Sequence, residues 1–401
     1  MEELPVAQFG QMRLSDSETL APRRVALAFL TLGVMLVGCS RDRSPSSAAT
    51  PADPVAPAAP VERVVNLYNW FEYISPEVLE AFTAETGIRV NLDTFDSAEM
   101  LEARLLAGRS GYDVVVTNGN FLQRQIASGV FGKLDRGRLS GLANLDPTFT
   151  AQMATYDSGN AYAVGYNFGS VGIGYDSKEV AARTGNATVD SWGLVYDPAQ
   201  ASRVADCGIT IIDSPTDVVP TVLAYLGKDP NSQVPADLEA AGDVLMGIRP
   251  YVRRIDSASI YEDLPGGEVC VVVGWNGIVV GGQERARDLK DGPDLRYVVP
   301  REGSIIWFDA FTIPADAPHP EEAHALIDFM LRPESAARNV SATHYGSVNA
   351  KATPLVESRL RDNPAVYPSA EELSRLVPQR TLSPEATRIV TRIWTRFRTG
   401  A

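Results

Sequence analysis

One short stretch of the chain places aromatic residues around a carboxylate: Tyr68-Asn69-Trp70-Phe71-Glu72-Tyr73. It follows the first predicted strand, at a strand-to-helix turn where ligand sites of α/β proteins gather. Aromatic faces attract ammonium groups, and a carboxylate supplies the charge-assisted hydrogen bond that a buried cation needs. The stretch therefore predicts a site for an organic cation. Alternatively, Trp70 is a core residue and Glu72 a solvated acid.

A second stretch, Trp307-Phe308-Asp309, repeats the combination of rings and a carboxylate. The same alternative applies, with Trp307 in the core and Asp309 in solvent. Two such stretches in one chain favour a cation site that both help to build.

Length and charge narrow the classes of protein. The chain has 401 residues, beyond the roughly 250 to 300 residues at which single cores stop growing, so two lobes are expected. Its formal charge is −14. An acidic surface argues against nucleic acid as a partner and tolerates cationic ligands.

The N-terminal region has the features of an export signal. Arg23-Arg24 precede an apolar run over 25–37, which is too short to span a bilayer comfortably. The run ends in Leu36-Val37-Gly38-Cys39, which resembles a bacterial lipobox. We expect 1–38 to be a lipoprotein signal peptide, Cys39 to be lipidated and 39–61, rich in Ser, Ala and Pro, to be a flexible tether. A simple secretory signal is the alternative.

Two cysteines remain beyond Cys39, namely Cys207 and Cys270. An even number of cysteines in an exported protein predicts a disulfide. Two buried free thiols are the alternative. No cysteine or histidine partners lie near the pair, which disfavours a zinc site, and no other metal-ligand cluster is visible.

Strands and helices alternate in the first half of the chain. Strands are predicted over 64–68, 89–94 and 112–116, and helices begin after Ser75 and Ser97. This βαβαβ pattern predicts an α/β lobe. The polar turn 117–120, which includes Asn120, should lie at the carboxyl end of the sheet beside Trp70.

The second half continues in the same way, and a second lobe is expected to begin near residue 171. Strands are predicted over 209–213, 269–275, 297–300 and 305–313, with a turn at Asn276-Gly277. Helices are predicted over 320–331 and 384–397.

Motifs along this order resemble the bacterial spermidine/putrescine-binding proteins of ABC importers. They are Tyr68-Asn69-Trp70, Glu85-Thr86-Gly87-Ile88, Phe95-Asp96-Ser97, Asn144-Leu145-Asp146-Pro147, Tyr225-Leu226-Gly227-Lys228-Asp229-Pro230, Gly274-Trp275, Leu331-Arg332-Pro333 and Ala352-Thr353-Pro354-Leu355. The resemblance implies an α/β fold of the periplasmic binding protein type. It has two lobes, hinge-crossing segments and a ligand cleft between the lobes. Lobe one is expected over 62–170 and 289–339, and lobe two over 171–288 and 340–401.

The resemblance also implies a set of ligand contacts, carried over position by position: Trp70, Phe71, Glu72, Tyr73, Asn120, Asp217, Ser257, Trp275, Trp307, Asp309, Tyr345 and Gln379. In such a box the rings cover methylene groups and the acids hold the nitrogens. Cys207 and Cys270 fall where putrescine-type members carry a disulfide.

Two positions depart from the putrescine-type pattern. Phe71 stands where family members have Ser or Thr, and Ile278 stands where putrescine binders have an Asp that holds one terminal amine. Trp275-Asn276-Gly277, Trp307 and Gln379 are instead similar to spermidine-type members. The pocket therefore favours spermidine, whereas the cysteine pair and the overall sequence point to the putrescine branch.

The function implied is a monomeric polyamine receptor in the periplasm or cell envelope. It is membrane-anchored through its lipid and delivers ligand to an ABC permease and ATPase, with no cofactor, no metal and no chemistry of its own. One alternative is a polyamine-sensing surface lipoprotein that signals to a partner. Another is an enzyme, since Glu72 and Asp309 could be the acid pair of a glycoside hydrolase, but rings around them suit an amine equally well.

Overall fold

The computed structural model describes residues 63–401. The predicted signal peptide, the lipidation site Cys39 and the tether 39–61 lie outside the described residues. Within 63–401, no helix combines the length and the apolar character needed to cross a bilayer.

The first part of the described chain forms the predicted βαβαβ unit. Strand β1 pairs in parallel with both β2 and β3. Ser75 accepts a hydrogen bond from Val78 N at the start of the first helix, and Gly87 ends it in the left-handed conformation, as expected from their types. The elements are β1 (Val64–Trp70), α1 (Pro76–Thr86), β2 (Arg89–Phe95), α2 (Ala98–Leu106), β3 (Val114–Asn118) and α3 (Gly119–Ala127).

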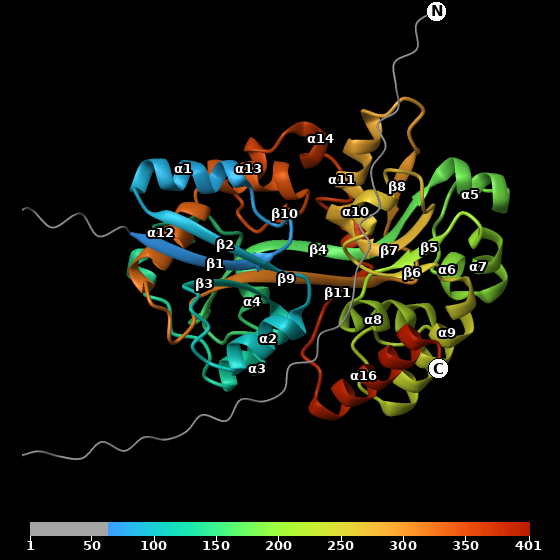
Figure 1. Ribbon diagram of the computed structural model, residues 1–401, viewed down its shortest axis with the longest axis horizontal. Coiled ribbons are helices and arrows are strands. Elements are labelled where there is room, and N and C mark those ends of the chain that lie inside the picture. Colours follow the sequence, from blue (N-terminus) through green and yellow to red (C-terminus); the bar gives the residue numbers. More distant parts are fainter. Residues whose placement is uncertain (1–62) are drawn as a thin grey trace, which may run out of the picture. The chain divides into compact units, whose positions relative to one another are not determined.

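Two long antiparallel strands run through the middle of the fold, β4 (Ala163–Asp176) and β9 (Ser304–Thr312) (Figure 1). Every residue of both strands is buried. β9 pairs with β3, and β4 pairs with β7. Between α3 and β4 the chain forms 3₁₀ turns at Arg136–Arg138 and Ser140–Asn144 and the helix α4 (Pro147–Met153).

A second group of elements lies beyond β4. Strand β7 pairs with β4 on one side and with β5 on the other. The elements are α5 (Ser177–Thr184), α6 (Gly193–Tyr196), α7 (Pro198–Val204), β5 (Ile209–Ile211), α8 (Pro215–Tyr225), α9 (Pro235–Ile248), a 3₁₀ turn (Arg249–Tyr251), β6 (Arg254–Ile255), α10 (Ile260–Asp263), β7 (Val271–Trp275), α11 (Asn276–Arg287) and β8 (Leu295–Val298).

The C-terminal part returns to both groups. Its elements are α12 (Pro320–Met330), α13 (Pro333–Thr343), β10 (Gly346–Ser347), a 3₁₀ turn (Thr353–Leu355), α14 (Ser358–Arg361), α15 (Ala370–Leu373), β11 (Leu376–Pro378) and α16 (Pro384–Thr399). β10 pairs with β4 and β11 with β9, whereas α16 lies against α9 (Figure 1).

The main path of the sheet is β2-β1-β3-β9-β4-β7-β5-β6, and off this path β8 and β10 pair with β4 and β11 pairs with β9. The two halves of this order correspond to the two groups of elements described above. We call the half with β1, β2, β3 and β9 lobe one and the half with β5, β6 and β7 lobe two. The long strands β4 and β9 pair with each other and join the two lobes. The residue bounds predicted for the lobes stay a prediction.

Three expectations differ from the structure. The stretch 117–120 is not a turn but the end of β3 and the start of α3. Asn276-Gly277 is not a turn but the start of α11, because Asn276 is buried and its amide accepts from Ser170 N and donates to Ala365 O. The long strand β4 was expected only as the beginning of a second lobe near residue 171. Its length was missed because four glycines and burial on both faces leave no alternating pattern.

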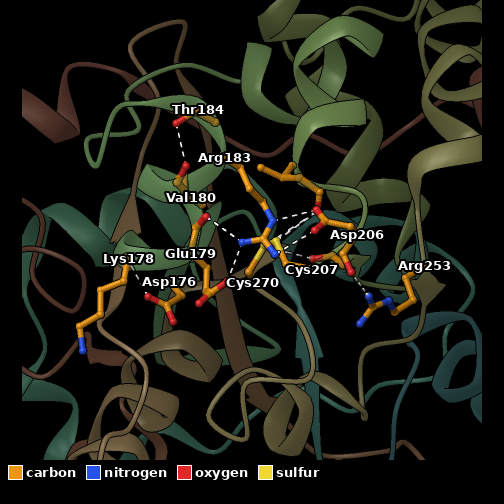
Figure 2. A network of polar contacts seen from close by, with 12 residues as sticks. Asp176, Lys178, Glu179, Val180, Arg183, Thr184, Asp206, Cys207, Arg253 and Cys270 are labelled. Carbon is orange, nitrogen blue, oxygen red and sulfur yellow. Dashed lines mark hydrogen bonds and ion pairs between the residues drawn. A yellow bond between two sulfur atoms is a disulfide. The ribbon is translucent and has the colours of Figure 1, made fainter.

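The predicted disulfide is present between Cys207 and Cys270, whose Cα atoms lie 5.5 Å apart. Beside it, the Arg183 guanidinium pairs with Asp206 at 2.8 Å, and Arg253 donates to the Asp206 carbonyl oxygen at 2.6 Å (Figure 2). The bond therefore ties the segment after α7 to the residue that precedes β7. It lies at the opposite end of β7 from Trp275.

Non-reducing peptide mapping should recover the Cys207–Cys270 peptide pair. Because the crosslink closes a long loop, replacing both cysteines by Ala should lower the free energy of unfolding by roughly 2 to 4 kcal/mol. Chemical denaturation of both proteins measures the difference. Two thiols titrating in unfolded, unreduced protein would contradict the pairing.

Candidate functional site

A cavity of about 370 Å³ lies between the two lobes. Lobe one contributes the turn after β1, the end of β3 and the middle of β9. Lobe two contributes the start of α8, the end of β7 and the segment before α10. The cavity thus opens where carboxyl ends of strands from both lobes meet.

Eleven of the twelve predicted contacts line this cavity: Trp70, Phe71, Tyr73, Asn120, Asp217, Ser257, Trp275, Trp307, Asp309, Tyr345 and Gln379. Glu72 does not. Its backbone is left-handed, with φ 51°, and its carboxylate accepts a hydrogen bond from Arg285 at 3.2 Å. Glu72 therefore joins the turn after β1 to helix α11 of lobe two.

Asp309 is the buried acid of lobe one, with 3% of its surface exposed. It lies on β9 opposite Asn118 of β3, and the Asn118 amide donates to its carboxylate at 2.7 Å. Because side chains alternate along a strand, Trp307 shares its face. Burial is the main cause that holds the pKa of Asp309 well above its usual value, and the nearby Asp217 charge adds to the effect.

Asp217 is the buried acid of lobe two, in the first turn of α8. Its carboxylate accepts hydrogen bonds from Ser214 Oγ at 2.8 Å, Trp275 Nε1 at 3.0 Å and Gln379 Nε2 at 3.2 Å. Burial raises the pKa of Asp217, and the three hydrogen bonds oppose that shift. The donors fix the direction of the carboxylate without neutralising it.

Three aromatic rings form one wall of the cavity. The ring centroid of Tyr345 lies 5.1 Å from that of Tyr73 and 5.3 Å from that of Trp307. Two glycines permit this packing, because a Cβ at Gly277 would lie 2.4 Å from the Tyr345 ring and one at Gly169 would lie 2.3 Å from the Trp307 ring. The wall is therefore built from rings seated directly on backbone.

The mouth of the cavity carries further rings. Phe71 is 51% exposed and meets Tyr261 of lobe two edge-on, with 6.3 Å between centroids. Inside, the buried atoms Trp70 Nε1, Trp307 Nε1 and Asn120 Oδ1 have no hydrogen-bond partner among the described residues. Buried polar atoms without partners are uncommon, and these three belong to residues that line the cavity.

Sequence reasoning missed several lining residues. Asn118, Ser214 and Tyr261 all face the cavity. Asn118 lies in the predicted polar stretch 117–120, two residues before Asn120, and Ser214 directly precedes Pro215, a pattern typical of a helix start, so both could have been inferred from position. Nothing in the sequence near Tyr261 signals its place.

Ile278, whose type underlies the predicted length preference, is 1% exposed and does not line the cavity. It occupies the first turn of α11, beside the Gly277 that supports Tyr345. Its side chain therefore has no surface in the cavity, and a length preference has to come from other residues.

The arrangement can bind a cation. Among the described residues, no Lys, Arg or His lies within ion-pair distance of Asp217 or Asp309, although both are buried in a cavity lined with rings. No described cluster of His, Cys, Asp and Glu could hold a metal ion. Burying an ionised carboxylate without a counter-charge costs free energy, and a bound cation would reduce that cost.

Solved structures share this architecture. A putative spermidine/putrescine ABC transporter from Listeria monocytogenes superposes with a TM-score of 0.76 at 29% identity, covering 84% of this chain and 100% of that one. The fold is therefore that of the two-lobed periplasmic binding proteins, as predicted.

Sequence comparisons define the family. Residues 77–368 match the bacterial extracellular solute-binding proteins. The putrescine/agmatine-binding protein of Pseudomonas aeruginosa is 46% identical over 338 residues, which are 84% of this chain and 92% of that protein. The putrescine-binding periplasmic protein PotF of Escherichia coli is 40% identical over 338 residues, covering 84% and 91%. The chain belongs to the bacterial extracellular solute-binding protein family.

Asp309→Asn keeps the shape of the side chain and removes its charge. We expect cation affinity to fall by at least about 2 kcal/mol, near thirtyfold, because the ligand would be buried without its counter-charge.

The raised pKa of Asp309 also predicts that cation binding depends on pH. A bound cation favours the ionised carboxylate, so at pH values near or below the raised pKa binding should release a proton, and affinity should fall as pH falls through that pKa. Calorimetry in buffers of different ionisation enthalpy measures both effects.

Asp190→Asn is the matched control, because Asp190 is an exposed acid outside the cavity that pairs with Arg301. It removes one charge from the surface and should leave affinity within about twofold, since exposed charges are screened. An Asp309→Asn effect no larger than that of the control would mean that the cation binds elsewhere.

Proposed function

We propose that this protein is an extracytoplasmic polyamine receptor that delivers its ligand to the permease and ATPase of an ABC importer and catalyses no reaction itself. One observation carries the proposal: two buried carboxylates, Asp217 and Asp309, face an aromatic cavity in which no described side chain supplies a positive charge. An ammonium group at each acid and methylene groups against the rings would satisfy both features. The names of the relatives at 46% and 40% identity support a polyamine.

The rings also suit a flexible chain. A polyamine pays conformational entropy on binding, and apolar contact with Trp275, Trp307 and Tyr345 offsets part of that cost. Contact between the rings and methylene groups would not by itself favour a polyamine over an alkane. The two carboxylates supply the selection, because an uncharged chain would leave both unpaired.

Within this class we propose spermidine in preference to putrescine. Two cavity residues, Trp307 and Gln379, resemble those of spermidine-type members, and a triamine can place its extra nitrogen near Asp96, which also lines the cavity. The relatives named above for putrescine support the shorter ligand instead.

Titration calorimetry with putrescine, cadaverine, agmatine, spermidine and spermine tests both levels. The protein should first be unfolded, with its disulfide intact, washed and refolded to remove co-purified ligand. We expect spermidine to bind more tightly than putrescine by roughly 1 to 3 kcal/mol, the range for a hydrogen bond to a charged group. Tighter binding of putrescine would overturn the length preference, and no binding of any amine would overturn the function.

We further propose that Cys39 carries the lipid anchor and that the protein acts at the cell envelope. The sequence Leu36-Val37-Gly38-Cys39 supports this proposal. Cys39→Ser should move the protein from the membrane fraction to the soluble envelope fraction, because a single lost anchor leaves only a soluble globule. Detergent phase partitioning of both forms measures the shift. Identical partitioning would contradict lipidation.

A further inference from the structure

We propose that Pro220, which does not line the cavity, positions Gln379 and through it the buried acid Asp217. Pro220 lies inside helix α8. A proline has no backbone N–H, so it cannot give the Thr216 carbonyl the hydrogen bond that residue 220 of a regular helix would donate. The free carbonyl of Thr216 instead accepts a hydrogen bond from Gln379 Nε2 at 2.6 Å.

The orientation of the Gln379 amide follows from its partners. Its Nε2 also lies 3.2 Å from Asp217 Oδ1. The Thr216 carbonyl and the Asp217 carboxylate are both acceptors, so only the nitrogen of the amide can face them. Both N–H groups are then used, and no described residue donates to the amide oxygen. That oxygen is left for the cavity, which Gln379 lines.

Gln379 stands where the two lobes meet. Gln379 N donates to Ile306 O of β9 at 3.0 Å, and on either side of it Pro378 O and Arg380 N are hydrogen-bonded to the Asn231 side chain of lobe two. The Tyr156 hydroxyl donates to the Gln379 carbonyl. The Gln379 side chain ends on α8 of lobe two. The Thr216 carbonyl that Pro220 leaves free thus becomes the acceptor for a side chain on the segment after β11.

A second consequence concerns stability. A proline in the interior of a helix is unfavourable, both through the lost hydrogen bond and through the clash of its ring with the carbonyl four residues earlier. Pro220→Ala should therefore raise the melting temperature, while it weakens the site. A purely structural proline predicts that stability and affinity move together or that affinity stays constant.

The test rests on the proposed function and compares ligand-free proteins prepared as above, titrated with spermidine and putrescine. In Pro220→Ala the new N–H of residue 220 competes for Thr216 O, so affinity for the better ligand should fall about three- to tenfold, the loss of about one hydrogen bond. Pro215→Ala is the matched control. Pro215 is the first residue of the same helix, where the N–H has no helical partner, so affinity should not change.

Coupling to Gln379 makes the test specific. Gln379→Met keeps the length of the side chain and removes its donors. In that background Pro220→Ala should cause no further loss of affinity, because the acceptor has no side chain left to hold. An equal loss in both backgrounds would overturn the inference, as would unchanged affinity in Pro220→Ala alone.

A readout without ligand separates this inference from the proposed function. The side-chain amide of Gln379, assigned by NMR through its loss in Gln379→Met, should be shifted and protected from exchange in the parent protein, and it should lose that protection in Pro220→Ala. Unchanged protection overturns the inference whether or not a polyamine binds. Failure of every amine to bind, with protection lost as expected, would overturn only the proposed function.

Discussion

The structure depends on keeping two carboxylates out of water without a basic partner. Burial raises the pKa of both Asp217 and Asp309, and the charge of Asp217 raises that of Asp309 further. Each acid has neutral donors that hold its direction, three on Asp217 and Asn118 on Asp309. Neutral donors stabilise a negative charge but do not cancel it. The counter-charge for the two carboxylates therefore has to come from a bound ligand.

The shared strands explain how one site can be built from two lobes. β4 and β9 run between the lobes, and β9 carries both Trp307 and Asp309 (Figure 1). Side-chain hydrogen bonds also cross between the lobes, such as that from Arg285 to Glu72. Packed strands are stiff, whereas such contacts can open and re-form, which is the combination that hinge closure requires.

Local signals in the sequence were enough for the first lobe. Ser75 with Pro76 and Gly87 fixed a helix, and short apolar runs between such helices predicted parallel strands. Local patterns do not indicate which distant segments of the chain contact each other. Asp217 and Gln379, which share a hydrogen bond, lie 162 positions apart in the sequence. Asn276 is predicted in a turn, but in the structure its side-chain amide joins β4 to the segment before α15. Family resemblance found eleven cavity residues, but Glu72 points instead to Arg285, because its ion pair and left-handed backbone turn it toward α11.

The number of buried acids constrains the ligand more strongly than their surroundings do. A monoamine could neutralise one carboxylate and would leave the other buried and unpaired, with the penalty that burial imposes on an isolated charge. Protonating the second acid would avoid that penalty but remove the attraction that distinguishes an ammonium from any apolar chain. A ligand with ammonium groups at both ends satisfies both acids at once, and each pairing lowers the repulsion that the first acid imposes on the second. The separation of the two acids then sets how long the uncharged part of that ligand can be.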